Sequence, residues 1–233
     1  MTNKKIAFFS CEIPRQIPDF LENKGYVSVF LPSFGNLDTP VSHHPDMLFS
    51  TTFDGALLCD EEYLKDNPFL LDIGISLVTS CKKLGKKYPD DILFDALIIG
   101  ETVYGTIDSI APEILKNRRT VSLKQGYTLC STLVTDKCAI TADEGIYLSL
   151  SQNGVDTLKI SAGNILLEGY GCGFIGGASC FDKGSDTVVF FGNIATHPDG
   201  EGIIAFLQKH GHRVVFFEEF PLSDFGGAKL INK

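Results

Sequence analysis

Hydrophobic and polar positions follow one recurring pattern: a short apolar strand, an amphipathic helix and a second apolar strand. Lys5 to Ser10 is a short apolar run of the kind expected for a buried strand. Pro14 to Lys24 has helical spacing of its apolar residues, and Gly25 stands where a helix C-cap favours glycine. Tyr26 to Leu31 returns to a strand pattern. The chain is therefore predicted to open strand, helix, strand.

The same order of elements appears twice more. Ala139 to Thr141 predicts a strand, Asp143 is a suitable helix N-cap, and Val155 to Ile160 predicts the next strand. In the third copy, strands are expected at Val188 to Phe191 and at Arg213 to Phe217, around a helix that Gly211 closes. Thr141-Ala-Asp-Glu-Gly145 also aligns with Thr196-His-Pro-Asp-Gly200. Self-similarity of this kind is typical of repeat architectures.

A second repeated element is a short strand that turns back into another strand near an acidic residue. Its copies begin at His44-Pro-Asp46, Cys130-Ser-Thr132, Gly177-Ala-Ser179 and Gly227-Ala-Lys229. A further pair of short strands is expected within Asp95 to Tyr104, on either side of Gly100-Glu101. Together these elements make about five units of roughly 47 residues each.

Five such units predict a closed ring in one domain, residues 1–233, with the first strand of each unit around the centre and the helices outside. This is an α/β fold, a five-fold pseudo-symmetric β/α-propeller of strand–strand–helix–strand units. The alternative is an open doubly wound sheet with chance similarity. That alternative lacks a GxGxxG turn after the first strand, where the sequence reads Ser10-Cys-Glu-Ile-Pro.

Composition and charge exclude some classes of function for this chain. The net charge of −9 disfavours nucleic-acid binding, because phosphate backbones require Lys and Arg. No apolar stretch is long enough for a membrane helix or an export signal, so a cytoplasmic location without membrane binding is expected. The seven cysteines include no CxxC pair, so we expect reduced thiols and neither a metal site nor a cofactor.

The ordered motifs then support a family resemblance. They include Ser42-His-His-Pro-Asp-Met47, Lys124-Gln-Gly-Tyr127, Gly173-Phe-Ile-Gly-Gly177, His197-Pro-Asp-Gly200 and Pro221-Leu-Ser-Asp-Phe-Gly-Gly227. They resemble the pentein superfamily of guanidino-group-modifying enzymes, and more closely a bacterial branch of it with no assigned function. The resemblance spans most of the chain.

The resemblance implies a β/α-propeller and, in the catalytic members, a nucleophilic cysteine in the last unit and a histidine–acid element in a later one. Here the last strand reads Gly226-Gly-Ala-Lys-Leu-Ile231, with Lys229 or Leu230 at the equivalent of the thiol position. Of the two H-x-D motifs, His44-Pro-Asp46 lies in the first unit, and His197-Pro-Asp199 stands at the expected start of a helix, where Pro and Asp are favoured for capping. The sequence therefore departs from the guanidine-modifying pattern at both places.

The ring nevertheless predicts one polar site at its centre. Cys130, His44 and Asp46 form a coherent catalytic set, because a thiol requires a nearby base or cation to become a thiolate. Thr132, Ser179, Asp224 and Lys229 are expected to bind a ligand at the same place. Cys130 is also expected to be the most readily alkylated cysteine. The competing interpretation is a buried strand thiol beside a histidine that stabilises a turn.

Two functions stay open from the sequence. One is a small-molecule-binding protein, in its catalytic form a cysteine-dependent hydrolase of an amidine-like or guanidine-like group. The other is a non-catalytic module that binds a protein partner, as the resemblance to the ribosome anti-association factor of the same superfamily implies. The reactivity of Cys130 separates them, because a lowered thiol pKa would favour the hydrolase.

Overall fold

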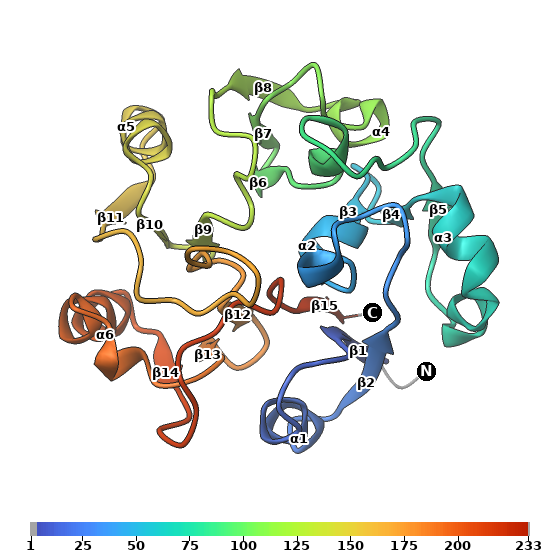
Figure 1. Ribbon diagram of the computed structural model, residues 1–233. Coiled ribbons are helices and arrows are strands. Elements are labelled where there is room, and N and C mark those ends of the chain that lie inside the picture. The colour runs from blue at the N-terminus through green and yellow to red at the C-terminus, as the bar shows by residue number, and fades with distance from the viewer. Residues whose placement is uncertain (1–3, 233) are drawn as a thin grey trace.

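The computed structural model describes residues 4–232. Its strands form five three-stranded sheets around a central axis, and the principal helices lie on the outside (Figure 1). In each sheet the inner strand pairs antiparallel with the middle strand, which pairs parallel with the outer strand. The predicted five-unit propeller is confirmed.

The five units are built from elements of similar order. The first contains β1 (Lys5–Ser10), α1 (Gln16–Glu22), β2 (Tyr26–Leu31) and the inner strand β15 (Lys229–Asn232). The second contains β3 (Ser50–Thr51), β4 (Leu57–Cys59), α3 (Glu61–Asp66) and β5 (Leu77–Thr79). The third contains β6 (Leu97–Ile99), β7 (Thr102–Gly105), α4 (Pro112–Leu115) and β8 (Arg119–Ser122).

The last two units contain the longest helices. The fourth has β9 (Thr132–Val134), β10 (Cys138–Thr141), α5 (Glu144–Gln152) and β11 (Asp156–Lys159). The fifth has β12 (Ser179–Asp182), β13 (Thr187–Phe190), α6 (Gly200–Lys209) and β14 (Arg213–Val215). Short 3-10 helices lie at Thr39–Val41, Pro68–Ile73, Asp90–Ile92 and Ile194–Thr196.

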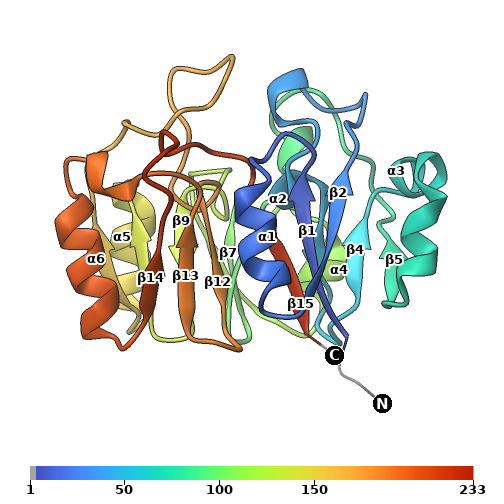
Figure 2. The same ribbon diagram turned by 90° about the horizontal axis from the view of Figure 1, so that it is seen from below.

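The two ends of the chain close the ring together. β15 pairs antiparallel with β1, and Lys229 lies opposite Phe8 in the register. The strand that completes the first unit thus comes from the C-terminal end, as the sequence predicted (Figure 2). The inner surface of the ring depends on this last strand.

Glycines confirm the repeat at the level of the backbone. Gly25, Gly154 and Gly211 follow the three aligned helices, and their φ angles are +88°, +81° and +81°. Glycine adopts this left-handed conformation without the cost that a Cβ imposes. The same physical requirement therefore recurs at the same place in three units.

The prediction of the first inner strand is wrong. His44 to Leu48 does not extend; instead α2 (Pro45–Leu48) forms one helical turn, and the strand β3 begins only at Ser50. Pro45 occupies the first helical position, where its missing N–H costs nothing. The Asp46 N–H donates to the carbonyl of Gly226, 3.1 Å away, and this bond ties the turn to the segment before β15.

Apolar side chains fill the space between neighbouring units. Phe8 of β1 contacts Phe49, with ring centroids 5.3 Å apart, in a buried cluster that includes Leu58 of β4 and Val103 of β7. The layers between units are therefore largely apolar, and a group of buried carboxyl and thiol side chains lies at the axis. Among residues 4–232, no helix has the length and apolar character needed to cross a membrane.

Candidate functional site

Four acidic or thiol side chains meet at the axis of the ring. Asp46 belongs to α2, whereas Asp95, Cys130 and Asp224 belong to the segments that lead into β6, β9 and β15. None is more than 6% exposed. Because these segments precede inner strands of different units, only ring closure brings the side chains together.

The Cys130 thiol lies between two carboxyl groups. Its Sγ is 3.1 Å from Oδ2 of Asp46 and in still closer contact with Oδ2 of Asp95. Asp95 also accepts the backbone N–H groups of Leu129, at 2.6 Å, and of Cys130, at 3.4 Å. Asp95 therefore fixes the loop that carries the thiol.

Asp224 is held by backbone donors. Its Oδ1 accepts the N–H of Gly226 at 2.9 Å and its Oδ2 accepts that of Phe174 at 2.8 Å. A Cβ on Gly177 would lie only 1.9 Å from Oδ1 of Asp224, so glycine is required there. The double-glycine motif before β12 thus makes room for this carboxyl group.

Burial governs the ionisation of this cluster. It raises the pKa of Asp46, Asp95 and Asp224 to about 7, and mutual repulsion of neighbouring carboxylates adds to the effect. Burial and the same carboxylates raise the pKa of the Cys130 thiol well above its ordinary value. The free protein therefore opposes a thiolate at Cys130, contrary to the expectation of a readily alkylated cysteine.

His44 does not assist the thiol as expected. Its Nδ1 lies 3.8 Å from Oδ1 of Asp224 and 4.0 Å from Oδ1 of Asp46, which is too long for a hydrogen bond. Burial, together with neighbouring His43, lowers the pKa of His44 to about 3, so the imidazole is neutral at pH 7. His44 consequently supplies no positive charge to the cluster.

The seven residues expected at one pocket border two cavities instead. The first, which we call the loop cavity, has a volume of about 160 Å³ and is bordered by His44, Cys130 and Asp224. The second, the strand cavity, has a volume of about 220 Å³ and is bordered by Asp46, Thr132, Ser179 and Lys229. The Asp46–Cys130 contact joins a residue of one cavity to a residue of the other.

The loop cavity has aromatic walls and acidic corners. Tyr127 and Phe174 stack with centroids 6.3 Å apart and an interplanar angle of 25°. The Tyr127 hydroxyl donates to Oδ2 of Asp91 at 2.6 Å, while Oδ1 of Asp91 is buried and has no hydrogen-bond partner among residues 4–232. Tyr170 and Asp224 complete this surface. A planar cation would find both π faces and carboxylate oxygens here.

Several of these residues were not predicted from the sequence. Asp95, Asp91, Tyr127, Tyr170 and Phe174 were not expected at a site. One signal was present for Asp95, because it immediately precedes an inner strand of the third unit, as Cys130 does in the fourth. The aromatic residues lie in irregular segments, where the repeat pattern does not align them with positions in other units.

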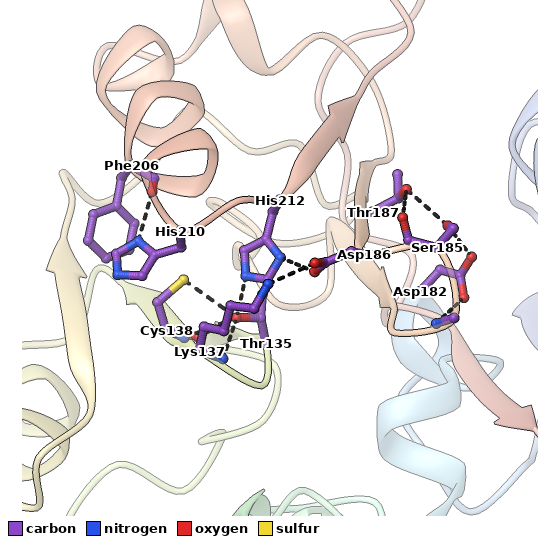
Figure 3. Close-up of polar contacts among 11 residues, drawn as sticks. Thr135, Lys137, Cys138, Asp182, Ser185, Asp186, Thr187, Phe206, His210 and His212 are labelled. Atoms are coloured by element: carbon purple, nitrogen blue, oxygen red, sulfur yellow. Dashed lines mark hydrogen bonds and ion pairs between the residues drawn. The ribbon is translucent and has the colours of Figure 1, made fainter.

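A separate group of potential metal ligands lies between the fourth and fifth units. Oxygen or nitrogen atoms of Asp136, Asp186 and His212 come within 4.8 Å of one another. His212 lies 2.6 Å from Asp186 and 2.9 Å from Thr135, and Lys137 pairs with Asp186 at 2.7 Å (Figure 3). Both imidazole nitrogens are thus engaged, and the network joins the two units.

Comparisons with solved structures agree with the fold. A variant of dimethylarginine dimethylaminohydrolase in adduct with S-methyl-L-thiocitrulline is 11% identical, with a TM-score of 0.54 and coverage of 94% of this chain and 93% of that chain. The enzyme in adduct with 4-chloro-2-hydroxymethylpyridine is 12% identical, with a TM-score of 0.53 and the same coverage. At such identities the similarity shows the fold alone.

Sequence comparison places the chain within a family. Curated proteins give no match to it. Residues 8–228 match the model described as "Family of unknown function (DUF6873)". This stretch includes every residue of both cavities except Lys229. The chain therefore belongs to the DUF6873 family, and its fold is that of the pentein superfamily.

Proposed function

We propose that the loop cavity binds a small organic cation of the guanidine or amidine class. One observation carries the proposal: three buried carboxyl groups gather at the ring axis, and one of them, Asp224, borders the loop cavity. Among residues 4–232, no Lys or Arg forms an ion pair with Asp46, Asp95 or Asp224. Buried carboxylates are stable only when paired, so a cationic ligand would supply the missing charge.

The walls of the cavity favour a planar cation. A guanidinium or amidinium group stacks on aromatic faces and donates several hydrogen bonds in one plane. The Tyr127–Phe174 pair offers the stacking surface, and the free Oδ1 of Asp91 offers an acceptor beside it. Dimethylarginine, named in the enzyme with the similar fold, also carries a guanidinium group.

Binding of a cation would release protons. The pKa values of the three axial carboxyls are raised to about 7 in the free protein. A positive charge nearby lowers the pKa of a carboxyl, so a fraction of these groups would lose protons on binding. Affinity should therefore increase as the pH rises from 5 to about 7.

Cysteine-dependent hydrolysis is the second candidate, because Cys130 borders the same cavity. In that reaction the thiol proton would pass to Asp46 or Asp95, and the sulfur would attack the central carbon of the ligand. An amine would then leave, and water would release the urea-type product. The high thiol pKa opposes the first step in the free protein, so we place binding before catalysis.

Titration with methylguanidinium tests the proposal, with methylurea as the uncharged control. We expect the cation to bind and methylurea to bind at least tenfold more weakly. Asp224→Asn should weaken cation binding at least tenfold, since a hydrogen bond to a charged group contributes about 1.5–3 kcal/mol. Asp108→Asn, at an exposed position, is the matched control.

Equal binding of methylguanidinium and methylurea would refute cation recognition. The same samples distinguish the second candidate through release of methylamine, which leaves urea, or of ammonia, which leaves methylurea. Release that is lost in Cys130→Ala, while binding persists, would establish the hydrolase. Binding without release in the wild-type protein would establish the binding function alone.

A further inference from the structure

The strand cavity differs in chemistry from the loop cavity. Apolar residues of β9 and β12 border much of it, among them Leu133, Val134 and Phe181. Thr132 and Lys229 place polar groups on the same surface. The cavity therefore suits a small molecule with an aliphatic part and a polar end.

Two buried oxygen atoms of residues that border this cavity are without partners. Oγ1 of Thr132 and Oδ1 of Asp46 form no hydrogen bond among the residues that the structure describes. Thr132 is 2% exposed. A buried polar group without a partner costs about 1–3 kcal/mol, and a ligand that supplies the partner recovers this energy. A ligand in the cavity that reached these two atoms would supply the hydrogen bonds that they lack.

Lys229 adds a positive charge to the wall of this cavity. Its ammonium group makes no ion pair and no hydrogen bond within residues 4–232. Burial, and then the cation of Arg118, lower its pKa to about 8, and these effects outweigh the opposing charge of Asp46. An anion beside Lys229 would relieve this deficit.

Arg118 reinforces the positive character of this end of the ring. Its guanidinium donates to the carbonyls of Thr51 and Thr52, both at 2.9 Å, and is thereby fixed at the end of the inner strand β3. The strand cavity thus lies near two cations and the carboxyl group of Asp46, whereas Asp91 and Asp224 border the loop cavity. The charged groups around the two cavities therefore differ.

We infer that the strand cavity is a second ligand site, separate from the loop cavity, which binds a small aliphatic carboxylic acid bearing a hydrogen-bond donor. The ammonium of Lys229 attracts the carboxylate, and the hydroxyl of Thr132 donates to one of its oxygens. The donor on the ligand meets Oδ1 of Asp46. The apolar wall of β9 and β12 contacts the hydrocarbon chain.

The donor set favours a carboxylate over other ligands. A cationic ligand would be repelled by Lys229, and a phosphate would leave several of its oxygens without donors on a largely apolar wall. A carboxylate needs few donors and leaves the rest of the molecule free to contact that wall. A single alkyl carboxylate therefore fits the charge, the donors and the wall together.

Amide NMR titration tests this inference with 2-hydroxybutyrate, its neutral amide and inorganic phosphate as probes. We expect 2-hydroxybutyrate to shift the amide signals of β9, β12 and β15, and the other two probes to bind at least tenfold more weakly. Lys229→Met should weaken binding at least tenfold, and Thr132→Val about tenfold. Lys183→Met, in the exposed turn between β12 and β13, should bind as the wild type does.

Equal binding of the acid and its amide, preference for phosphate, or unchanged binding in Lys229→Met would each overturn the inference. Thr132→Val changes no charge and is nearly isosteric, so it keeps the test valid if Lys229→Met fails to fold. A titration of Asp224→Asn separates the two sites. Loss of methylguanidinium binding there, with 2-hydroxybutyrate binding retained, shows that the strand cavity acts independently of the proposed cation site.

Discussion

Replacement of Asp46 by asparagine tests the electrostatics of the axial cluster. In the folded protein the pKa of this carboxyl is raised to about 7, chiefly by burial and secondly by the charge of Asp95. In an unfolded chain an aspartate titrates near pH 4. The folded state therefore holds a proton between about pH 4 and pH 7 that the unfolded state has lost.

The sign and size of the effect follow from this difference. A raised carboxyl pKa contributes stability that is complete below pH 4 and is lost as the pH rises to 7. The loss is about 1.4 kcal/mol per pH unit, or about 4 kcal/mol over the whole window. Asp46→Asn does not titrate. Relative to the wild type, its free energy of unfolding should therefore rise by about 2 kcal/mol between pH 5 and pH 7, since the wild-type carboxyl is half ionised at pH 7.

The difference between variant and wild type is the quantity to measure. Burial lowers the pKa of His43 and His44, and their contribution to stability therefore changes with pH in the opposite direction. These contributions cancel when the two proteins are compared at each pH. Urea unfolding followed by circular dichroism suits a chain without tryptophan. A pH-independent difference, or a gain equally present in Asp108→Asn, would refute the reasoning.

Three further outcomes follow from the same geometry. Gly177→Ala should lower the melting temperature by at least 5 °C, since its Cβ would collide with Oδ1 of Asp224. Gly202→Ala, on an open face of α6, should leave the melting temperature unchanged. Equal melting temperatures of the two variants would count against the collision. Removal of residues 226–233 deletes β15 and should abolish cooperative unfolding; a truncated protein with unchanged melting temperature would show that the ring does not depend on that strand. Brief iodoacetamide treatment followed by peptide mapping should leave Cys130 unmodified until urea is added, and early labelling of Cys130 would contradict its burial. The first cysteines to react should be the three exposed ones, Cys11, Cys81 and Cys172.

The ring could be predicted from the sequence because its units repeat locally. Apolar spacing and a closing glycine define each helix and the strand that follows it, and these signals need no long-range information. The first unit shows the limit of such signals. Pro45 turns its segment into α2, so Asp46 reaches the axis from a helical turn rather than from a strand.

The candidate site was less accessible to sequence reasoning. Cys130, Asp46 and Asp224 were expected near the axis, and the structure brings them there, but the contacts of the thiol depend on Asp95 from another unit. The division into two cavities follows from side-chain packing across the ring. Such packing is set by all five units together, and the repeat pattern alone does not encode it.

The most direct test of the central claim counts the protons released when methylguanidinium binds. Calorimetric titrations at pH 6.5, in two buffers of different ionisation enthalpy, give that number without a structural probe. We expect the wild-type protein to release between a fraction of a proton and two protons, and Asp224→Asn to release fewer. Binding with no proton release, or with proton uptake, would contradict the proposal that the cation is recognised by the buried carboxyl cluster.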